Sequence, residues 1–162
     1  MPVKTLYIVR HGKALQDYRL IHDYDRPLIE KGIVNNISVA KQLHAQYATP
    51  GLIISSHAAR ALHTAHIFAR VTGYPHERVQ VNENLYLDGE REAYSILESL
   101  PDELESVMIV GHNPDVTYIA NTYATNIHSI PTSGVVTIRF EADQWIEIDK
   151  SKAKCTVIFS NS

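Results

Sequence analysis

The sequence predicts an α/β fold of three layers, α/β/α, around a mixed and mostly parallel central sheet. Up to Pro131, short apolar runs alternate with segments of helical periodicity, which indicates βαβ crossovers and parallel strands. Beyond Pro131, short β-rich runs follow one another without helices between them, so we expect antiparallel strands there. The length of 162 residues suits a single domain over residues 1–162.

The expected strands are short runs of apolar and β-branched residues that stop at polar or turn-forming residues. The later strands are expected at residues 135–140, 145–148 and 156–159, and Trp145 is expected in the core. In the parallel part, strands are expected at residues 5–9, 52–54, 79–81 and 107–110.

Helices are expected between these strands, where apolar residues recur three or four positions apart. Pro27 suits the first turn of the first helix because its missing N–H would be unpaired there anyway. Ser55 or Ser56 is expected to cap the second helix, which Gly73 closes. The helices are expected to begin at Pro27, Ala58, Glu90 and either Pro114 or Asp115.

Composition excludes several classes of protein. Hydrophobic residues make up 44% of the chain, enough for a buried core, while the net charge of -3 gives no broad basic surface for nucleic acid. No apolar run approaches the roughly 18 residues of a membrane-spanning helix. A single cysteine, Cys155, forms no internal disulfide, and no signal peptide is evident at the N-terminus. We therefore expect a cytoplasmic protein with neither a nucleic-acid nor a membrane partner.

Polar residues follow three of the expected parallel strands. Arg10 and His11 end the first strand, Ser55 and Ser56 the second, and Gly111-His112 the fourth, while Arg60 lies one turn into the helix after the second. Ligands of open α/β sheets bind at the carboxyl ends of the strands. We therefore expect these side chains to meet at one edge.

Such a cluster suits phosphoryl transfer. Two guanidinium groups match the oxygens of a phosphate, and the start of the helix that carries Arg60 adds backbone N–H groups. The neutral imidazole of His11 can attack phosphorus without prior deprotonation and form a phosphohistidine intermediate. His112, if protonated near the phosphate, would donate a hydrogen bond to the developing charge.

The same residues resemble the motifs of the histidine phosphatase superfamily, the group of cofactor-dependent phosphoglycerate mutases and acid phosphatases. The stretches Leu-Tyr-Ile-Val-Arg10-His11-Gly, Ser55-Ser-His-Ala-Ala-Arg60-Ala and Val-Gly-His112-Asn-Pro match in order. The short length, the Asp-Arg-Pro-Leu segment and a late Pro-Thr-Ser-Gly are similar to small SixA-type phosphohistidine phosphatases. The resemblance implies a phosphoglycerate mutase-like fold and a phosphatase that needs neither metal nor cofactor.

The resemblance also implies roles for individual residues. His11 would accept the phosphoryl group, Arg10 and Arg60 would bind its oxygens, and His112 would complete the site. Asp23 matches an aspartate of the SixA-type group and is a candidate acid or orienting group. Glu83 lies near where some relatives carry the acid, although the match is off by a position, so the proton donor stays open between Asp23, Glu83 and none.

A site without a dedicated acid favours substrates whose leaving group departs readily, such as the imidazole of phosphohistidine. We therefore expect a phosphorylated protein as substrate. The alternatives are a small phosphorylated metabolite, or a module that binds phosphorylated partners without catalysis. Intact His11 argues against the last of these.

Several other polar residues have two readings. Arg26 could bind substrate, but we favour pairing with Asp23 or Asp25. His57 could contact substrate or serve as a cap or core residue. His63 and His66 stand three apart on one helix, close to metal-ligand spacing, yet too few ligands accompany them for zinc, so a structural role is favoured.

Overall fold

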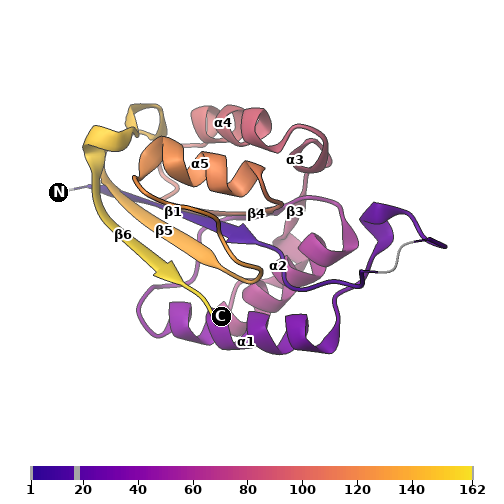
Figure 1. Ribbon diagram of the computed structural model, residues 1–162. Coiled ribbons are helices and arrows are strands. Elements are labelled where there is room, and N and C mark those ends of the chain that lie inside the picture. The colour runs from indigo at the N-terminus through magenta and orange to yellow at the C-terminus, as the bar shows by residue number, and fades with distance from the viewer. Residues whose placement is uncertain (1, 17–18, 162) are drawn as a thin grey trace.

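The computed structural model describes residues 2–16 and 19–161 and forms one six-stranded sheet with helices on both faces (Figure 1). The strand order is β3-β2-β4-β1-β5-β6. The first four are mutually parallel, whereas β5 runs antiparallel to both β1 and β6. The mixed, mostly parallel sheet predicted from the sequence is confirmed. The strands are β1 (Val3–Arg10), β2 (Ile53–Ser55), β3 (Gln80–Val81), β4 (Ser106–Gly111), β5 (Val135–Glu141) and β6 (Ala153–Phe159).

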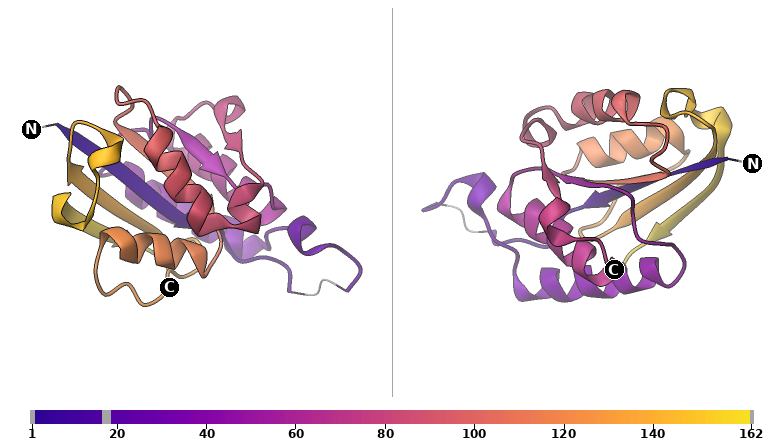
Figure 2. Two further views of the ribbon diagram at one scale, coloured as in Figure 1. Left: turned by 90° about the horizontal axis from the view of Figure 1, so that it is seen from above. Right: turned by 180° about the vertical axis from the view of Figure 1, so that it is seen from behind.

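Helices α1 and α2 cover one face of the sheet, and α3, α4 and α5 cover the other (Figures 1 and 2). Alternate residues of β1 serve the two sides: Leu6 and Ile8 join one apolar core, Tyr7 and Val9 the other. Both sets are buried because helices cover both faces. The helices are α1 (Glu30–His44), α2 (Ala59–Thr72), α3 (Asn84–Leu87), α4 (Gly89–Ser99) and α5 (Asp115–Tyr123).

The first helix begins at Glu30, not at Pro27 as the sequence suggested. The preceding residues instead lie against the chain that leaves β1. Ala14 forms a β-bridge with Leu28, and the N–H of Ile29 donates to the carbonyl of Lys13 at 3.0 Å. These contacts hold residues 28 and 29 beside the chain that follows β1.

The strand predicted at residues 145–148 is wrong. Trp145–Glu147 form a short 3-10 helix, in which the Gln144 N–H donates to the Glu147 carboxylate at 2.9 Å. The backbone N–H of Trp145 donates to the Asp102 carboxylate, so it is not available to a neighbouring strand, and the indole N–H donates to the Leu104 carbonyl. Trp145 is 1% exposed, which confirms its predicted place in the core.

Candidate active site

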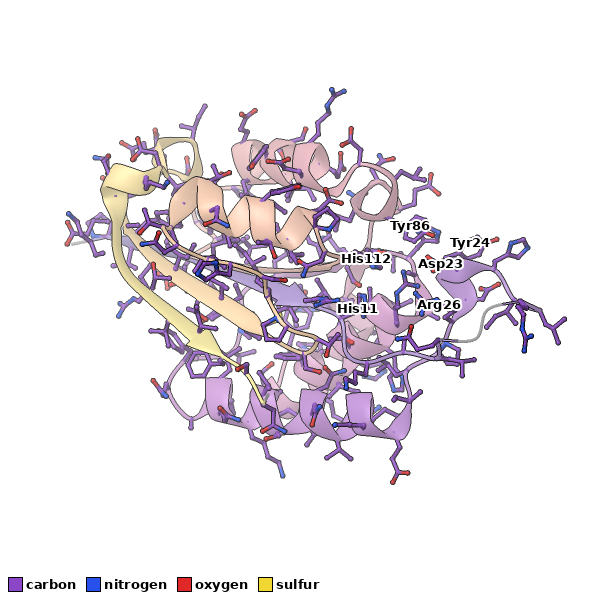
Figure 3. All side chains as sticks on the ribbon, viewed as in Figure 1. His11, Asp23, Tyr24, Arg26, Tyr86 and His112 are labelled. Carbon is purple, nitrogen blue, oxygen red and sulfur yellow. The ribbon has the colours of Figure 1, made fainter. Side chains whose placement is uncertain are left out.

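The register of the sheet brings the three strand ends together. Arg10 lies opposite Gly111 in β1 and β4, and Ser55 lies opposite Val110 in β2 and β4. The residues that follow therefore leave the sheet side by side. The rings of His11 and His112 have their centroids 5.1 Å apart, and Figure 3 shows both at the same end of the sheet. Arg10, His11, Arg60 and His112, the residues that the sequence predicts to be catalytic, are called the catalytic cluster below.

The backbone carbonyl of the next residue, Gly12, holds the His11 ring in one orientation. Its Nδ1 lies 2.7 Å from the Gly12 carbonyl oxygen, which can only accept, so Nδ1 carries the proton and Nε2 keeps a lone pair. The Gly12 N–H donates to the Thr64 hydroxyl at 3.0 Å. A Cβ on Gly12 would come within 2.8 Å of the Asn36 amide, so the close approach requires glycine.

Arg60 is buried in the first turn of α2 and reaches the lone pair of His11. Its Nε lies 3.4 Å from His11 Nε2, a long contact that leaves the nitrogen loosely held. The other two guanidinium nitrogens both bind Asp23. One donates to its backbone carbonyl at 2.7 Å and the other to its carboxylate at 2.9 Å.

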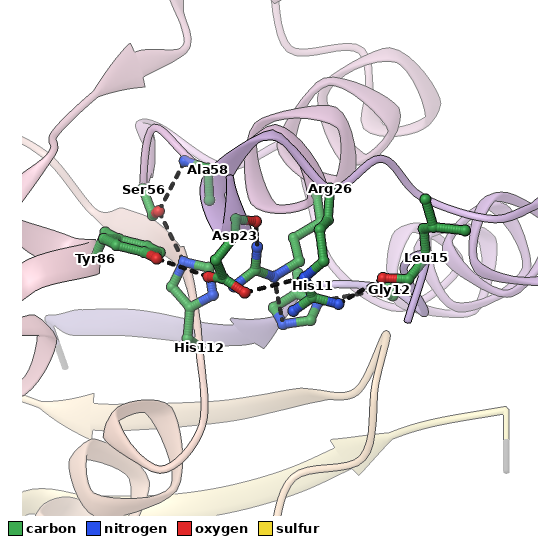
Figure 4. Close-up of polar contacts among 10 residues, drawn as sticks. His11, Gly12, Leu15, Asp23, Arg26, Ser56, Ala58, Tyr86 and His112 are labelled. Atoms are coloured by element: carbon green, nitrogen blue, oxygen red, sulfur yellow. Dashed lines mark hydrogen bonds and ion pairs between the residues drawn. The ribbon is translucent and has the colours of Figure 1, made fainter. Parts of the chain in front are cut away.

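His112 is buried at the end of β4, with its Nε2 2.8 Å from the Ser56 hydroxyl oxygen. Ser56 does not cap α2 in the usual way, since its oxygen accepts from the N–H of Ala58, which itself precedes the helix. Figure 4 shows this chain from Ala58 through Ser56 to His112. The other ring nitrogen of His112, Nδ1, is buried and has no partner in the described part of the chain.

Burial keeps both histidines neutral. Desolvation lowers the pKa of His11 to about 4, helped by the charges of Arg60 and Arg10 and opposed by the Gly12 hydrogen bond. Desolvation, the neighbouring His11 and Arg60 lower the pKa of His112 to about 3. Arg10 donates to the Ile130 carbonyl at 3.0 Å, while its buried Nε lacks a partner among the described residues. The cluster thus combines neutral imidazole rings with nearby cations.

Asp23 lies in the short 3-10 helix Asp23–Asp25, which the chain places beside the cluster. Its carboxylate accepts from Arg26 Nε at 3.0 Å and from Tyr86 at 2.6 Å, in addition to Arg60. Partial burial raises its pKa, but the hydrogen bonds from Tyr86, Arg60 and Arg26 outweigh burial and hold the pKa well below its usual range. Asp23 is therefore ionised, and the pairing that we favoured for Arg26 is with Asp23.

Tyr86 and Tyr24 are not among the site residues predicted from the sequence. Tyr86 comes from α3, a helix of four residues that no periodic pattern marks, and its hydroxyl points at Asp23 (Figure 4). Glu83, the other candidate acid, is exposed, and its backbone carbonyl accepts from the N–H of Tyr86 in the turn that starts α3. The side chain three positions later reaches the site instead.

The pair His63 and His66 does not gather further ligands. Within residues 2–16 and 19–161, no group of three or more His, Cys, Asp or Glu side chains could hold a metal ion. His66 instead lies near His76, with ring centroids 6.1 Å apart. None of the helices in the same ranges is both long and apolar enough to cross a membrane.

Comparison with known proteins identifies the class. A family model of the histidine phosphatase superfamily, branch 1, matches residues 6–113, a span that holds both histidines of the cluster. An uncharacterized protein of Picosynechococcus sp. is 32% identical over 142 residues, covering 83% of this chain and 84% of its own length. An uncharacterized chloroplastic protein of Arabidopsis thaliana is 26% identical over 153 residues, 89% of this chain and 70% of its own. This chain belongs to the histidine phosphatase superfamily.

Solved structures confirm the fold. The protein histidine phosphatase SixA complexed with tungstate has a TM-score of 0.79 and 22% identity, and the match covers 96% of each chain. A mycobacterial glucosyl-3-phosphoglycerate phosphatase has a TM-score of 0.68 at 16% identity, over 91% of this chain and 95% of its own. A phosphoglycerate mutase of Bacillus anthracis has a TM-score of 0.62 at 17% identity, over 88% and 90%. The expected phosphoglycerate mutase-like fold is therefore correct, and family membership supports a phosphatase.

Proposed function

We propose that this chain is a metal-independent phosphatase that passes a phosphoryl group first to His11 and then to water, with phosphohistidine in a protein as its substrate. The observation that carries the proposal is the neutral Nε2 of His11, which faces Arg60 and lies beside His112. The SixA structure, whose fold this chain shares, was solved with tungstate, a tetrahedral oxyanion like phosphate.

In the first step, the Nε2 lone pair attacks phosphorus and the bond from phosphorus to the leaving group breaks, so that its electron pair leaves with that group. Arg10 and Arg60 balance the charge of the phosphoryl oxygens. When the Ser56 hydroxyl donates to Nε2 of His112, the neutral ring carries its proton on Nδ1, and Nδ1 is then a donor for a phosphoryl oxygen. His112 need not be charged to do this.

In the second step, water attacks the phosphohistidine, the N–P bond breaks, and its electron pair returns to Nε2. The products are inorganic phosphate and the original His11. Positive charge in both steps comes from side chains of the cluster, so no metal ion is required. A cytoplasmic location is proposed with the same substrate and rests on the single cysteine alone.

The test is turnover in EDTA on a protein carrying phosphohistidine and on p-nitrophenyl phosphate. We expect both reactions to require His11, so His11→Ala should be inactive, while the exposed control His44→Ala should match the wild type. Brief mixing with labelled substrate should leave an acid-labile, alkali-stable label on the wild type only.

The ratio of the two rates separates the substrate classes. Faster turnover of the phosphohistidine protein supports the proposal, and faster turnover of the small ester favours a metabolite phosphatase. A wild type that binds phosphate but turns over neither substrate would identify a binding module and refute the catalytic proposal.

A further inference from the structure

Aromatic rings continue outward from the catalytic cluster. The Tyr86 ring lies with its centroid 5.4 Å from that of His112, and its other neighbours are His57 at 5.3 Å and Tyr24 at 6.4 Å. Tyr24 is itself 5.5 Å from His57. These three side chains, Tyr24, His57 and Tyr86, are called the aromatic wall. They come from three separate elements: the 3-10 helix Asp23–Asp25, the turn before α2, and α3.

The wall is not simply an extension of the apolar core. Tyr24 belongs to neither core cluster and is 40% exposed, yet it contacts rings on both sides. His57 and Tyr86 lie inward, and the ring of His22 lies outward, parallel to that of Tyr24 with the centroids 5.4 Å apart. Figure 3 shows Tyr24 and Tyr86 together near Asp23, beyond the strand ends. Exposed apolar surface beside a reactive cluster is typical of a binding site.

Two polar groups add to the aromatic wall. The Nδ1 atom of His57 is buried and has no partner in the parts of the chain that the structure describes. The Tyr86 hydroxyl donates to Asp23, whose carboxylate also binds Arg60 of the cluster. Asp23 thus links the wall to Arg60, the arginine proposed to bind phosphate. A ring that contacts Tyr86 is separated from Arg60 by Asp23 alone.

On the function proposed above, we propose that the aromatic wall receives the leaving group and selects substrates in which the phosphoryl group is attached directly to a flat aromatic ring. His11 attacks phosphorus in line with the bond that breaks, so a ring bonded to phosphorus lies just across the phosphoryl group from His11. Tyr86 of the wall packs against the ring of His112, which is itself next to His11. An aromatic ring gains edge or stacking contacts there that an alkyl chain cannot make.

Imidazole and phenol are both flat aromatic leaving groups. Imidazole leaves from a phosphohistidine residue, and phenol leaves from an aryl phosphate ester. Both rings also leave more readily than an alkoxide, which suits a site whose nearby carboxylate, Asp23, is already ionised. The wall and the charge of Asp23 therefore favour the same group of substrates for independent reasons.

The experiment compares two substrate pairs on the wild type and on Tyr24→Leu. One pair is a phosphohistidine peptide and the phospholysine peptide of the same sequence. The other is phenyl phosphate and hexafluoroisopropyl phosphate. For each pair and each protein, kcat/KM of the substrate with the flat ring is divided by kcat/KM of the substrate without one. Because intrinsic reactivity and the fraction of folded enzyme cancel, the change in the ratio isolates the ring contact.

We expect the ratio to fall by roughly 2- to 12-fold in Tyr24→Leu, the effect of losing one aromatic pair. Tyr24→Phe, which keeps the ring, and Tyr118→Leu, which removes a tyrosine that is 54% exposed on α5, should leave it unchanged. If the ratio falls in the peptide pair alone, the leaving group that the wall receives is imidazole. If it falls in the ester pair alone, that leaving group is phenol.

An unchanged ratio in both pairs, with activity that still depends on His11, would overturn the aromatic wall and leave the proposed phosphatase intact. Activity that survives in His11→Ala would instead refute the proposed function. The two failures are therefore distinguishable in the same set of assays.

Discussion

Acidification tests the neutral state of His11 on which the mechanism depends. Burial is the largest cause that lowers the pKa of His11 to about 4, against 6.5 for an unperturbed imidazole. At pH 5 a pKa of about 4 leaves about 90% of the ring neutral, whereas the ordinary value would leave about 3%. The nucleophile should therefore stay unprotonated in mild acid.

The same shift makes folding stability depend on pH. The unfolded chain binds the His11 proton below about pH 6.5, and the native chain resists it until about pH 4. Stability should therefore be fully present above pH 6.5 and fall as the pH drops toward 4. For His11 alone, the free energy of unfolding should decrease by about 2 kcal/mol between pH 7 and pH 5. His112, with a pKa of about 3, should contribute a loss of the same sign.

Two measurements check this pH dependence. NMR titration of histidine-labelled protein, with His11→Asn and His112→Asn to assign the signals, gives the two pKa values directly. Urea unfolding at pH 7 and pH 5 gives the stability loss, which should be about 2 kcal/mol smaller in His11→Asn than in the wild type. A His11 midpoint close to 6.5, or an equal loss in wild type and variant, would show that the ring is not desolvated as the structure indicates.

Four further predictions concern other parts of the site and fold. Activity should be unchanged by EDTA; a loss restored by zinc or magnesium would contradict the metal-independent mechanism. Asp23→Asn should lower kcat/KM roughly ten-fold on phosphohistidine and on phenyl phosphate alike, because an ionised Asp23 orients Arg60; a loss confined to the ester would mark it as an acid. Thr64→Val should reduce the free energy of unfolding in urea by about 2–4 kcal/mol, since it removes the oxygen that accepts from the Gly12 N–H and from Asn36 Nδ2 in the core. Gly73→Ala should cost about 1–2 kcal/mol in the same assay because φ is 83° there, and an effect near zero would contradict a left-handed helix end.

The central sheet was predictable because its strands are buried on both faces. In a chain of alternating elements, a short continuous apolar run such as the one around Ile8 is typical of a strand covered by helices on both sides. The apolar run over residues 145–148 misled because its apolar residues lie in different environments. Trp145 is buried by hydrogen bonds and packing, whereas Ile146 is 71% exposed. Periodicity reports burial, and burial alone does not distinguish a strand from one helical turn.

The meeting of the cluster's side chains was predictable because strand ends at one edge of a parallel sheet must be neighbours. Tyr86 and Tyr24 were not, because each sits on a helix of three or four residues, too short for any periodic signal. Their position depends on how two loops fold over the strand ends. Nothing in the sequence around such a tyrosine indicates which ring or carboxylate its side chain will contact in the folded chain.

The charges around Asp23 bear directly on which bond the site can break. A general acid must hold a proton near neutral pH, yet the pKa of Asp23 lies far below that range and hydrogen bonding to Asp23 raises the pKa of Tyr86. Asp23 thus has no proton to give near neutral pH. Tyr86 is a weaker acid than a free tyrosine and already donates its hydroxyl to Asp23, so neither group is suited to protonate an alkoxide. A leaving imidazole can enter already protonated, and a phenol can leave as its anion. On the proposed function, the ion pairs that orient Arg60 and the aromatic wall therefore favour the same substrates, those whose phosphoryl group is carried on a ring.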